Sequence, residues 1–372
     1  MNIQHTRTNF TEGKVASVSG RVMQVRTLSK KLAFIVVEDT YAKIQVGIRS
    51  QNVPSRLDII QATGEMKKSQ TGELTVWDEN PVIIVKNEGD LPSHEGITNL
   101  DVAREKRCLQ ILTTPEIKKR LLLRSKVITQ IRSLLDRREF VELETPILSN
   151  VPSGATAKPF ITKSEALNQD FFLRIATEIH LKKALIAGFE RVYEIGKIFR
   201  NEGIDRTHNP EFTSIELYQS FAGLYEMKEI MILLLSELSD RKVCVFKDLE
   251  YDDVVAKFGL DFDSHLIEPT FVYGHPANDA PLCKLRPDGK CDRFEFYMNG
   301  FEIANAYNEL TDYKEQAIRL NGKGDDGLVE ALKYGMPPTG GMGIGIDRLV
   351  MALSNTDNIA DVIMFPSKRN AN

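Results

Sequence analysis

The feature that most constrains the fold is a series of short strand-like runs near the start of the chain. Residues 15–25, 32–38, 42–48, 59–66 and 74–85 are rich in β-branched residues and partly alternate between apolar and polar positions, a pattern typical of β-strands. Turn-forming pieces such as LSKK, DTY and KKSQTG separate several of these runs. So many short strands leave unpaired edges unless the sheet closes on itself. The runs therefore predict a small closed β-barrel.

A barrel with this number of strands is typical of the OB type, and we assign it to residues 1–88. A polar stretch containing Gly and Pro follows, and we expect a linker over residues 89–114. The remainder, residues 115–372, changes in character and predicts a second, larger domain.

The second domain opens with a strong helical pattern over residues 115–140 and then mixes strands with helices. We expect further strands at residues 171–175, 191–199, 211–219, 293–299, 302–307 and 343–346. We expect further helices at residues 177–187, 225–241, 311–322 and 347–352. Strands in succession with irregularly placed helices predict an α+β domain, with a mostly antiparallel sheet flanked by helices.

Composition mainly excludes classes of protein. A hydrophobic fraction of 42% with 27% charged residues is ordinary for a soluble protein with a large core. The net charge of −4 does not require a polyanionic partner, although a local basic face would suffice to bind one. No window approaches the ~20 apolar residues of a membrane span, and no signal peptide is recognisable. We expect a cytoplasmic protein without a membrane partner.

The densest group of chemically useful residues is FRNEGIDRTHNPEF, at residues 199–212. It lies between two strand-like runs, so its charged side chains would gather in a loop at a sheet edge. Arg200 offers a planar fork that suits a phosphate, and His208 adds a second donor. Phe212 offers a flat face for a base. The alternative is a solvated hairpin whose charges are incidental.

A glycine-rich segment, GGMGIGIDRLVMAL, occupies residues 340–353. Its glycines permit close backbone approach to a ligand, and Asp347 stands where a helix N-cap is expected. Arg348 follows directly and is a second phosphate candidate. The spacing is not that of a dinucleotide fingerprint, and a glycine-rich strand end taken alone often reflects packing.

The segment RFEFYMNGFEIANAYNEL, at residues 293–310, predicts a hairpin with Glu295 and Glu302 on its two strands. Paired carboxylates invite a hard divalent cation, especially where a triphosphate supplies the other ligands. By simple alternation, Glu302 would face away from Asn305 and Tyr307. The alternative is a pair of ordinary exposed acids.

In the predicted barrel, basic residues surround Phe34 and Gln45, and Arg26 is one of them. Basic side chains interleaved with an aromatic ring and an amide suit single-stranded nucleic acid. The alternative is that the aromatic ring fills the core of the barrel.

Taken together, ETPIL, FRNEG…HNPEF and GMGIGIDRLVM resemble motifs 1, 2 and 3 of the class II aminoacyl-tRNA synthetases. The preceding barrel is similar to that of the subclass serving lysine, aspartate and asparagine. Within this subclass, AKPFIT, THNPEFTSIELY and EIANAYNEL resemble the lysyl-tRNA synthetases. The resemblance runs from about residue 15 to residue 369, with the motifs at residues 128–146, 191–218 and 340–353.

The resemblance implies that the chain activates L-lysine with ATP and Mg²⁺ and transfers it to tRNA(Lys), acting as a homodimer built on motif 1. It implies catalytic roles for Arg200 and Arg348 and metal ligation by Glu295 and Glu302. It implies an ATP site formed by Arg200, Glu202, His208, Phe212, Glu295, Glu302 and Arg348. It implies a lysine site formed by Gly154, Glu178, Glu216, Tyr218, Asn305, Tyr307 and Glu309. It implies anticodon contacts at Arg26, Phe34 and Gln45.

The chain departs from the family pattern in a few places. Glycine, proline, serine and arginine are replaced, in that order, by Ser153, Thr177, Asn308 and Ala360. The segment between motifs 2 and 3 is shorter than usual, and the chain starts almost at the predicted barrel, so we expect effects on tRNA affinity more than on activation. Two rival functions stay open: lysylation of a protein, against which the barrel argues, and a binding-only role. The intact motif residues Arg200, His208, Glu302 and Arg348 argue against the latter.

Overall fold

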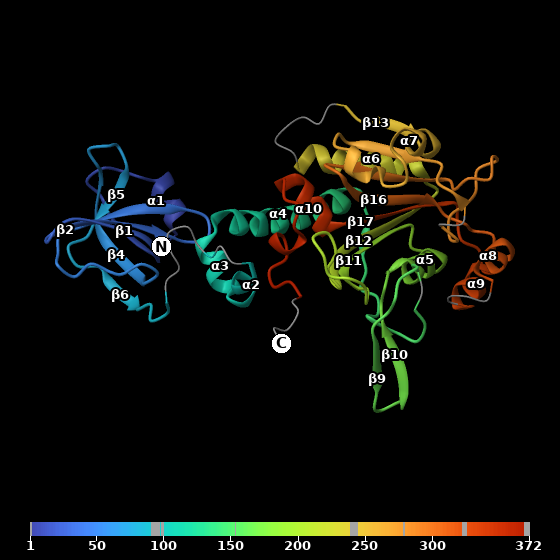
Figure 1. The fold of residues 1–372 in the computed structure, drawn as a ribbon, viewed down its shortest axis with the longest axis horizontal. Helices are drawn as coiled ribbons and strands as arrows, with labels where there is room; N and C mark the ends of the chain where they lie inside the picture. Colours follow the sequence, from blue (N-terminus) through green and yellow to red (C-terminus); the bar gives the residue numbers. More distant parts are fainter. Residues whose placement is uncertain are drawn as a thin grey trace. The chain divides into compact units, whose positions relative to one another are not determined.

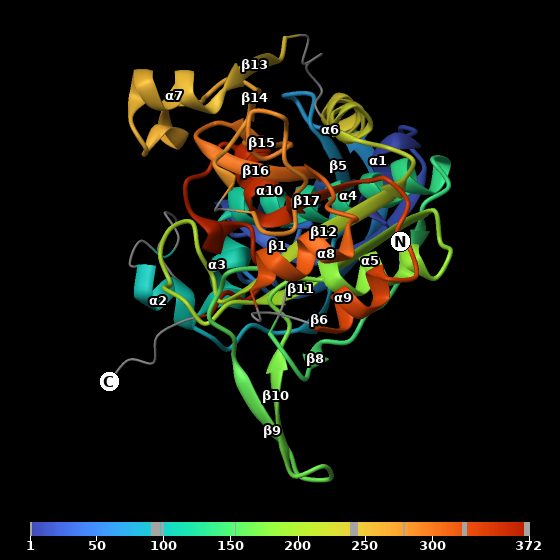
Figure 2. The same ribbon diagram turned by 90° about the vertical axis from the view of Figure 1, so that its right-hand side faces the viewer.

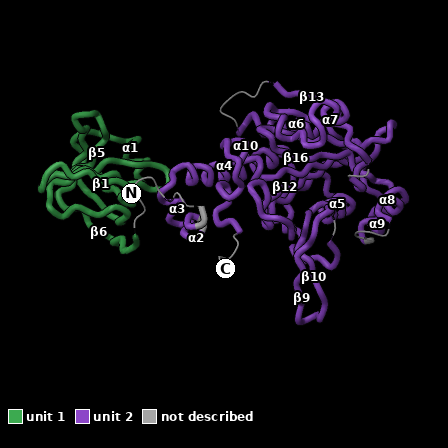
Figure 3. Tube along the Cα trace, viewed as in Figure 1, with its two compact units in different colours: residues 1–93 green, residues 94–372 purple. Residues whose placement is uncertain are grey.

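The computed structural model describes residues 2–90, 97, 100–152, 154–238, 245–277, 280–321 and 326–367. The departure at Ser153 and the last residues of two expected helices, 225–241 and 311–322, therefore lie outside the described residues. The chain divides into two compact units, residues 1–93 and residues 94–372 (Figure 3). In the described part of the chain, no helix is long and apolar enough to cross a membrane.

Unit 1 is built on one sheet, preceded by the short helix α1 (Ile3–Thr8). Its strands are β1 (Val15–Ser29), β2 (Leu32–Glu38), β3 (Lys43–Ile48), β4 (Ile59–Lys68), β5 (Leu74–Trp77) and β6 (Val82–Val85). The hydrogen-bonded pairings run β1-β2-β3-β5-β4 and return from β4 to β1. Alternate side chains of these strands form one core, which includes Val18, Ile35, Val37, Ile44, Val46 and Ile60. The alternation read from the sequence thus corresponds to inward-facing positions.

The single strand expected at residues 74–85 is two strands, β5 and β6. Between them lies a turn in which the Asp78 carboxylate accepts a hydrogen bond from the Asn80 amide, with Pro81 next. Asp, Asn and Pro favour such turns and cannot continue a strand pairing. The expected linker at residues 89–114 also differs, because it contains the helices α2 (Leu100–Glu105) and α3 (Arg107–Thr113).

Unit 2 is organised around an eight-stranded sheet with the order β13-β14-β15-β16-β17-β12-β11-β7 (Figure 1). Its strands are β7 (Val141–Glu142), β11 (Arg191–Phe199), β12 (Glu211–Ser220), β13 (Lys247–Glu250), β14 (Thr270–Tyr273), β15 (Arg293–Met298), β16 (Phe301–Asn308) and β17 (Thr339–Gly345). All pairings are antiparallel except β7 with β11 and β13 with β14. The predicted α+β class with an antiparallel-rich sheet is confirmed.

One face of this sheet carries the main core. The helices α4 (Pro115–Arg137), α6 (Leu224–Leu238) and α10 (Ile346–Ser354) pack on it. The apolar positions that predicted α4 from the sequence are largely those that it buries, such as Ile117 and Ile131. Asp347, expected at the N-cap of α10, lies inside its first turn instead, because Gly345 is the N-cap.

Among the described residues, helices cover the opposite face at its two ends. The helix α5 (Glu178–Ile186) packs on β11 and β12, backed by α9 (Asp326–Leu332), with α8 (Tyr313–Leu320) beside it. At the other edge, α7 (Tyr251–Phe258) and a short 3-10 helix (Phe262–His265) pack on β13, β14 and β15. A separate hairpin of β9 (Ile161–Ser164) and β10 (Gln169–Leu173), extended by β8 (Leu148–Ser149), projects from unit 2 (Figures 1 and 2). The central strands between these coverings are where the predicted site residues gather.

Candidate active site

The glycines of β17 form the floor of the site. Residues Met342 and Ile344 point into the main core, so Gly341, Gly343 and Gly345 lie on the opposite face. A Cβ atom added at Gly343 or Gly345 would meet no atom of the described residues closer than 3.7 Å, so these residues leave room for a side chain there. The glycine-rich run therefore leaves the middle of this face open to a ligand.

Gly341 has a different role in the floor. A Cβ atom there would lie 2.2 Å from Glu309 Oε1 and 2.4 Å from Tyr218 Cε1. Both contacts are far shorter than van der Waals distances. The absence of a side chain at Gly341 is what allows Glu309 and Tyr218 to pack over the same point of β17.

The motif 2 loop and α10 bring the expected phosphate ligands together. The Arg200 guanidinium lies over the Phe212 ring, 5.3 Å from its centre, and its Nε is buried without a hydrogen-bond partner. Arg348 Nη2 lies 3.2 Å from His208 Nε2, and His208 Nδ1 lies 2.9 Å from Asp205 Oδ2. With the proton on Nδ1, the imidazole donates to Asp205 and accepts from Arg348. Glu202, by contrast, is exposed.

Asp205, which the sequence argument did not single out, orients His208. Its partial burial opposes ionisation, but hydrogen bonds from the Thr207 amide and from His208 lower the pKa of its carboxyl to about 2. Asp205 therefore stays ionised at neutral pH and holds the imidazole in place. The signal that would have revealed it is its position three residues before His208 in a tight loop.

A bulge changes the expected direction of Glu302. The register pairs Glu295 with Asn305 and Phe296 with Ala304, but Tyr297 with Glu302, so Ile303 is the extra residue. One inserted residue reverses the alternation, and Glu302 therefore shares the face of Asn305 and Tyr307. The prediction that Glu302 faces away from them was wrong.

The two carboxylates predicted to bind a metal differ in their surroundings. The Glu295 carboxylate accepts a hydrogen bond from Tyr297 and forms charge pairs with Arg293 and His275. The Glu302 side chain is 35% exposed and lies 3.4 Å from Arg348 Nη1. In the part of the chain that the structure describes, no group of three potential ligands is close enough to hold a metal ion alone. The donor set fits Mg²⁺, which is usually held by one or two carboxylates together with substrate phosphates and water.

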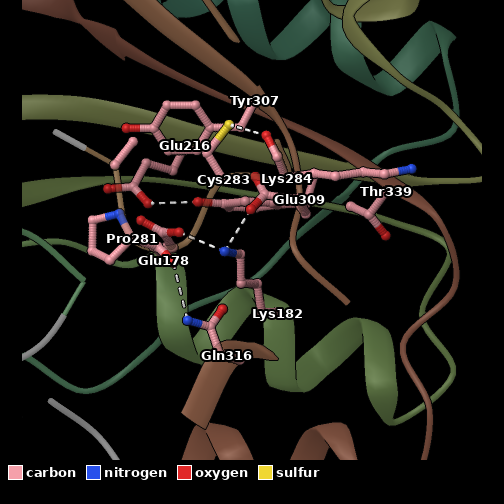
Figure 4. Close-up of polar contacts among 12 residues, drawn as sticks. Glu178, Lys182, Glu216, Pro281, Cys283, Lys284, Tyr307, Glu309, Gln316 and Thr339 are labelled. Carbon is pink, nitrogen blue, oxygen red and sulfur yellow. Dashed lines mark hydrogen bonds and ion pairs between the residues drawn. The ribbon is translucent and has the colours of Figure 1, made fainter. Parts of the chain in front are cut away.

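The residues predicted to bind the amino acid form an acidic pocket between α5, β12 and β16 (Figure 4). Tyr218 donates a hydrogen bond to Glu216 Oε2 at 3.2 Å, and the Thr177 amide donates to Glu216 Oε1 at 3.1 Å. Glu178 and Glu309 are both buried, with side-chain exposures of 9% and 1%. Three carboxylates thus converge on one pocket, which we call the acid pocket.

Lys182 lies inside the acid pocket and was not predicted. Its Nζ donates to Glu178 Oε1 at 2.6 Å and lies 2.5 Å from Glu309 Oε2 (Figure 4). The Lys182 ammonium thus forms ion pairs with both Glu178 and Glu309. The sequence carried a signal, because Glu178 and Lys182 are four residues apart on a helix.

Burial and mutual repulsion make the acids of this pocket resist ionisation. Glu216 keeps some contact with solvent, but desolvation and the Glu178 charge raise the pKa of its carboxyl to about 7. Burial also raises the pKa of Glu309, although the Lys182 ammonium acts in the opposite direction. A cationic ligand would relieve both carboxylates.

The other residues predicted for the amino acid lie around this pocket. Gly154 has a φ of +86°, and a Cβ atom there would lie 3.0 Å from Ala176, directly before α5. Asn305 donates to the Tyr307 hydroxyl at 3.3 Å, while its buried Oδ1 accepts no hydrogen bond from the residues that the structure describes. An unpartnered buried oxygen is costly unless a ligand satisfies it.

In unit 1, Arg26, Phe34 and Gln45 share one face of the sheet. Arg26 pairs with Phe34 across β1 and β2, and Gln45 pairs with Val36 across β2 and β3. Phe34 alternates with the core residues Ile35 and Val37, so it points outward, and the alternative that it fills the core is excluded. Trp77, which the sequence argument missed, lies against Phe34 with ring centres 5.4 Å apart.

Comparisons with known proteins agree with this geometry. Residues 99–369 match the family described as tRNA synthetases class II (D, K and N). The lysine–tRNA ligase of Fusobacterium nucleatum is 36% identical over 434 residues, covering 94% of this chain and 88% of the relative. That of Fervidobacterium nodosum is 37% identical over 442 residues, covering 98% and 87%. Both alignments exceed the 372 residues of this chain, so these relatives contain segments that it lacks. The chain belongs to the class II tRNA synthetases of the D, K and N group.

Proposed function

We propose that this protein is a lysine–tRNA ligase, which activates L-lysine with ATP and transfers it to tRNA(Lys). The observation that carries the proposal is the acid pocket, in which three carboxylates, those of Glu178, Glu216 and Glu309, lie around the single ammonium group of Lys182 among the described residues. A buried acid of this kind favours a ligand with an ammonium group and disfavours apolar side chains of similar size. The relatives named above, which are lysine–tRNA ligases, support the same conclusion.

The amino acid would bind with its two ammonium groups in the acid pocket. We infer that Tyr218 and Glu309, with Glu216 nearby, receive the ε-ammonium, and that Glu178 and the backbone at Gly154 receive the α-amino group. Asn305 would orient the carboxylate by donating a hydrogen bond from its side-chain amide nitrogen, with Tyr307 beside it. The carboxylate would then point along β17 towards the glycine floor.

ATP would lie above that floor. We infer that Phe212 stacks on adenine, that Glu202 meets the adenine edge, and that Arg200 binds the α-phosphate. His208 and Arg348, already in contact at 3.2 Å, would hold the other phosphates. Mg²⁺ bound with ATP would neutralise phosphate charge, and we infer that Glu302 and Glu295 would hold it.

The chemistry needs little covalent help from the protein. The lysine carboxylate attacks the α-phosphorus, the bond to the β,γ-phosphates breaks, and lysyl-adenylate and pyrophosphate form. The 3′-hydroxyl of the terminal ribose of tRNA then attacks the lysyl carbonyl and releases AMP. Arg200 and Arg348 would stabilise the charge that develops on phosphate, and the rigid sheet holds both reactants in place.

We infer that unit 1 is an OB-type barrel that binds the anticodon through Arg26, Phe34 and Gln45. The ring of strand pairings supports the barrel, and the outward-facing Phe34 beside Trp77 supports stacking of bases.

We also infer a homodimer, because motif 1 ends at an edge of the main sheet with exposed apolar residues, among them Val141, Ile147 and Leu148. The cytoplasmic location stays a prediction.

ATP–pyrophosphate exchange, scanned over the twenty amino acids and ornithine, tests the proposed activation. We expect exchange with lysine, and we expect Glu309→Gln to raise the KM for lysine about hundredfold, since it removes a charged partner with a value of ~3 kcal/mol. Glu315→Gln, a change of an exposed acid on α8, is the matched control and should leave KM unchanged. Exchange driven by another amino acid, or no exchange at all, would contradict the proposal.

A further inference from the structure

Lys182 is enclosed by protein to a degree that is unusual for lysine. Its side chain is 1% exposed, and it is among the largest fully buried side chains in the described part of the chain. Burying an ammonium group costs several kcal/mol, which an ion pair with good geometry only balances. Apolar residues of similar volume in place of the whole group of charges would serve the stability of the fold at least as well, whereas removing Lys182 alone would leave buried carboxylates unpaired. Stability alone therefore does not explain a lysine at this position.

The position of Lys182 follows from α5. Leu181 and Leu185 anchor this helix in an apolar cluster with Val192 and Leu328. Glu178 and Lys182 lie one turn apart on the side of the helix that faces β12 and β16. The Lys182 ammonium reaches past its own helix to Glu309 on the segment after β16, so it joins two separate elements of the pocket.

The charges around Lys182 set the charge of the whole pocket. The titratable groups that face the pocket are Glu178 and Lys182 from α5, Glu216 and Tyr218 from β12, Tyr307 and Glu309 from β16 and its end, and Cys283 from the adjoining loop. The tyrosines and the cysteine are neutral at neutral pH. Three carboxylates and one ammonium thus give a net charge of −2 when all are ionised, which balances the two ammonium groups of a lysine substrate.

Lys182 also leaves a place for the substrate. Its Nζ lies 2.5 Å from Glu309 Oε2, whereas Oε1 of the same carboxylate lies over Gly341, on the ligand face of β17. The ammonium therefore pairs with one oxygen of Glu309, and the other oxygen faces the glycine floor. A substrate ammonium can still donate a hydrogen bond to the same carboxylate.

We propose that Lys182 is a positioning residue that determines the specificity of the acid pocket. Its ammonium favours the ionised forms of Glu178 and Glu309 and holds both carboxylates in place, so that the pocket selects an amino acid carrying a second ammonium group. The inference rests on the proposed lysine activation and names the residue that tunes it. Without Lys182, repulsion among three buried carboxylates drives proton uptake by Glu309, and the protonated acid no longer distinguishes an ammonium from a neutral group.

The test compares Lys182→Met, Lys182→Gln and the control Lys183→Met in the full-length protein. Methionine keeps the length of the stem without the charge, glutamine keeps a donor without the charge, and Lys183 lies on the same helix outside the acid pocket. Lysine-dependent and methionine-dependent ATP–pyrophosphate exchange are measured at pH 7 and pH 9, together with the KM for ATP and thermal unfolding.

We expect Lys182→Met to raise the KM for lysine at least tenfold at pH 7. Above pH 7, the KM of this variant should fall about tenfold for each unit of rising pH, as Glu309 loses its proton. The preference for lysine over methionine should fall at least tenfold, while the KM for ATP stays close to wild type. The unfolding temperature should fall, because one partner of a buried ion pair is removed. Lys182→Gln should behave like Lys182→Met, and Lys183→Met like the wild type.

Several results would overturn the inference. A KM for lysine in Lys182→Met equal to that of an active wild type would do so. So would a normal KM in Lys182→Gln, because a hydrogen bond would then suffice without charge. A pH-independent loss that also affects ATP would reveal a merely structural role. If the wild type itself gave no exchange with lysine, the proposed function would fail, and this outcome is distinct from the others.

Discussion

The affinity for lysine should depend on pH through Glu216. Desolvation and the neighbouring Glu178 charge raise the pKa of the Glu216 carboxyl to about 7, well above its ordinary value. A cationic ligand favours the ionised carboxylate. The interaction is therefore present above pH 7 and is lost as the pH falls through that value, because a proton must leave Glu216 before lysine binds.

The magnitude follows from this pKa. With a pKa of about 7, the ionised fraction of Glu216 is about nine-tenths at pH 8 and about one-tenth at pH 6. Binding of lysine should weaken about tenfold over this range from Glu216 alone. Glu309, whose pKa is also raised by burial against the effect of Lys182, adds a second dependence. The diagnostic quantity is therefore the difference between the wild type and Glu216→Gln.

The assay is the KM for lysine in ATP–pyrophosphate exchange between pH 6 and pH 8, at saturating ATP so that changes at the phosphate side do not contribute. Glu216→Gln should bind lysine more weakly than the wild type at pH 8. Between pH 8 and pH 6, its KM for lysine should change about tenfold less than that of the wild type. Glu190→Gln, on a neighbouring exposed residue, should keep the full dependence. Equal slopes in the wild type and Glu216→Gln would refute the assignment of this titration to Glu216.

Two further changes test other parts of the site and its support. Thr177→Pro restores the family residue but removes the amide N–H that donates to Glu216 at 3.1 Å. This change should raise the KM for lysine at pH 7 about tenfold. Thr177→Ala keeps the amide N–H and should leave the KM unchanged. Arg124→Met removes the guanidinium 2.6 Å from the buried Asp347 and should lower the free energy of unfolding in urea by about 3–5 kcal/mol. Lys126→Met, on the exposed side of the same helix, should leave that free energy within about 0.5 kcal/mol of the wild type.

The sequence predicted those elements whose side chains repeat with a clear period. Residues 32–38 and 191–199 were expected as strands and coincide with β2 and β11, because alternation over a whole strand is hard to mistake. The prediction of a single strand over residues 74–85 was wrong, because both ends of this range are apolar and the turn between them is short. The strands β13 and β14 were not expected, since four residues at an edge carry too little pattern to be recognised.

The site was harder to predict than the fold, for two physical reasons. The bulge at Ile303 adds one residue to β16, and nothing in the local sequence distinguishes it from regular alternation. The role of Lys182 depends on Glu309, which is 127 positions later in the chain and reaches α5 only through the order of strands in the sheet. A helix pattern can show that Glu178 and Lys182 are neighbours, but not which third charge they meet.

The arrangement of the site explains how two ligands of opposite character can meet on one sheet. The acid pocket needs a cation and the loop of motif 2 needs an anion, and the strip between them is β17, where Gly343 and Gly345 contribute no side chain. Because the surrounding strands are buried on their other face by the main core, the floor cannot shift to accommodate a poor fit. Reacting atoms placed on such a floor are held in register by the backbone itself, and catalysis then depends on positioning and on charge rather than on a nucleophile from the protein.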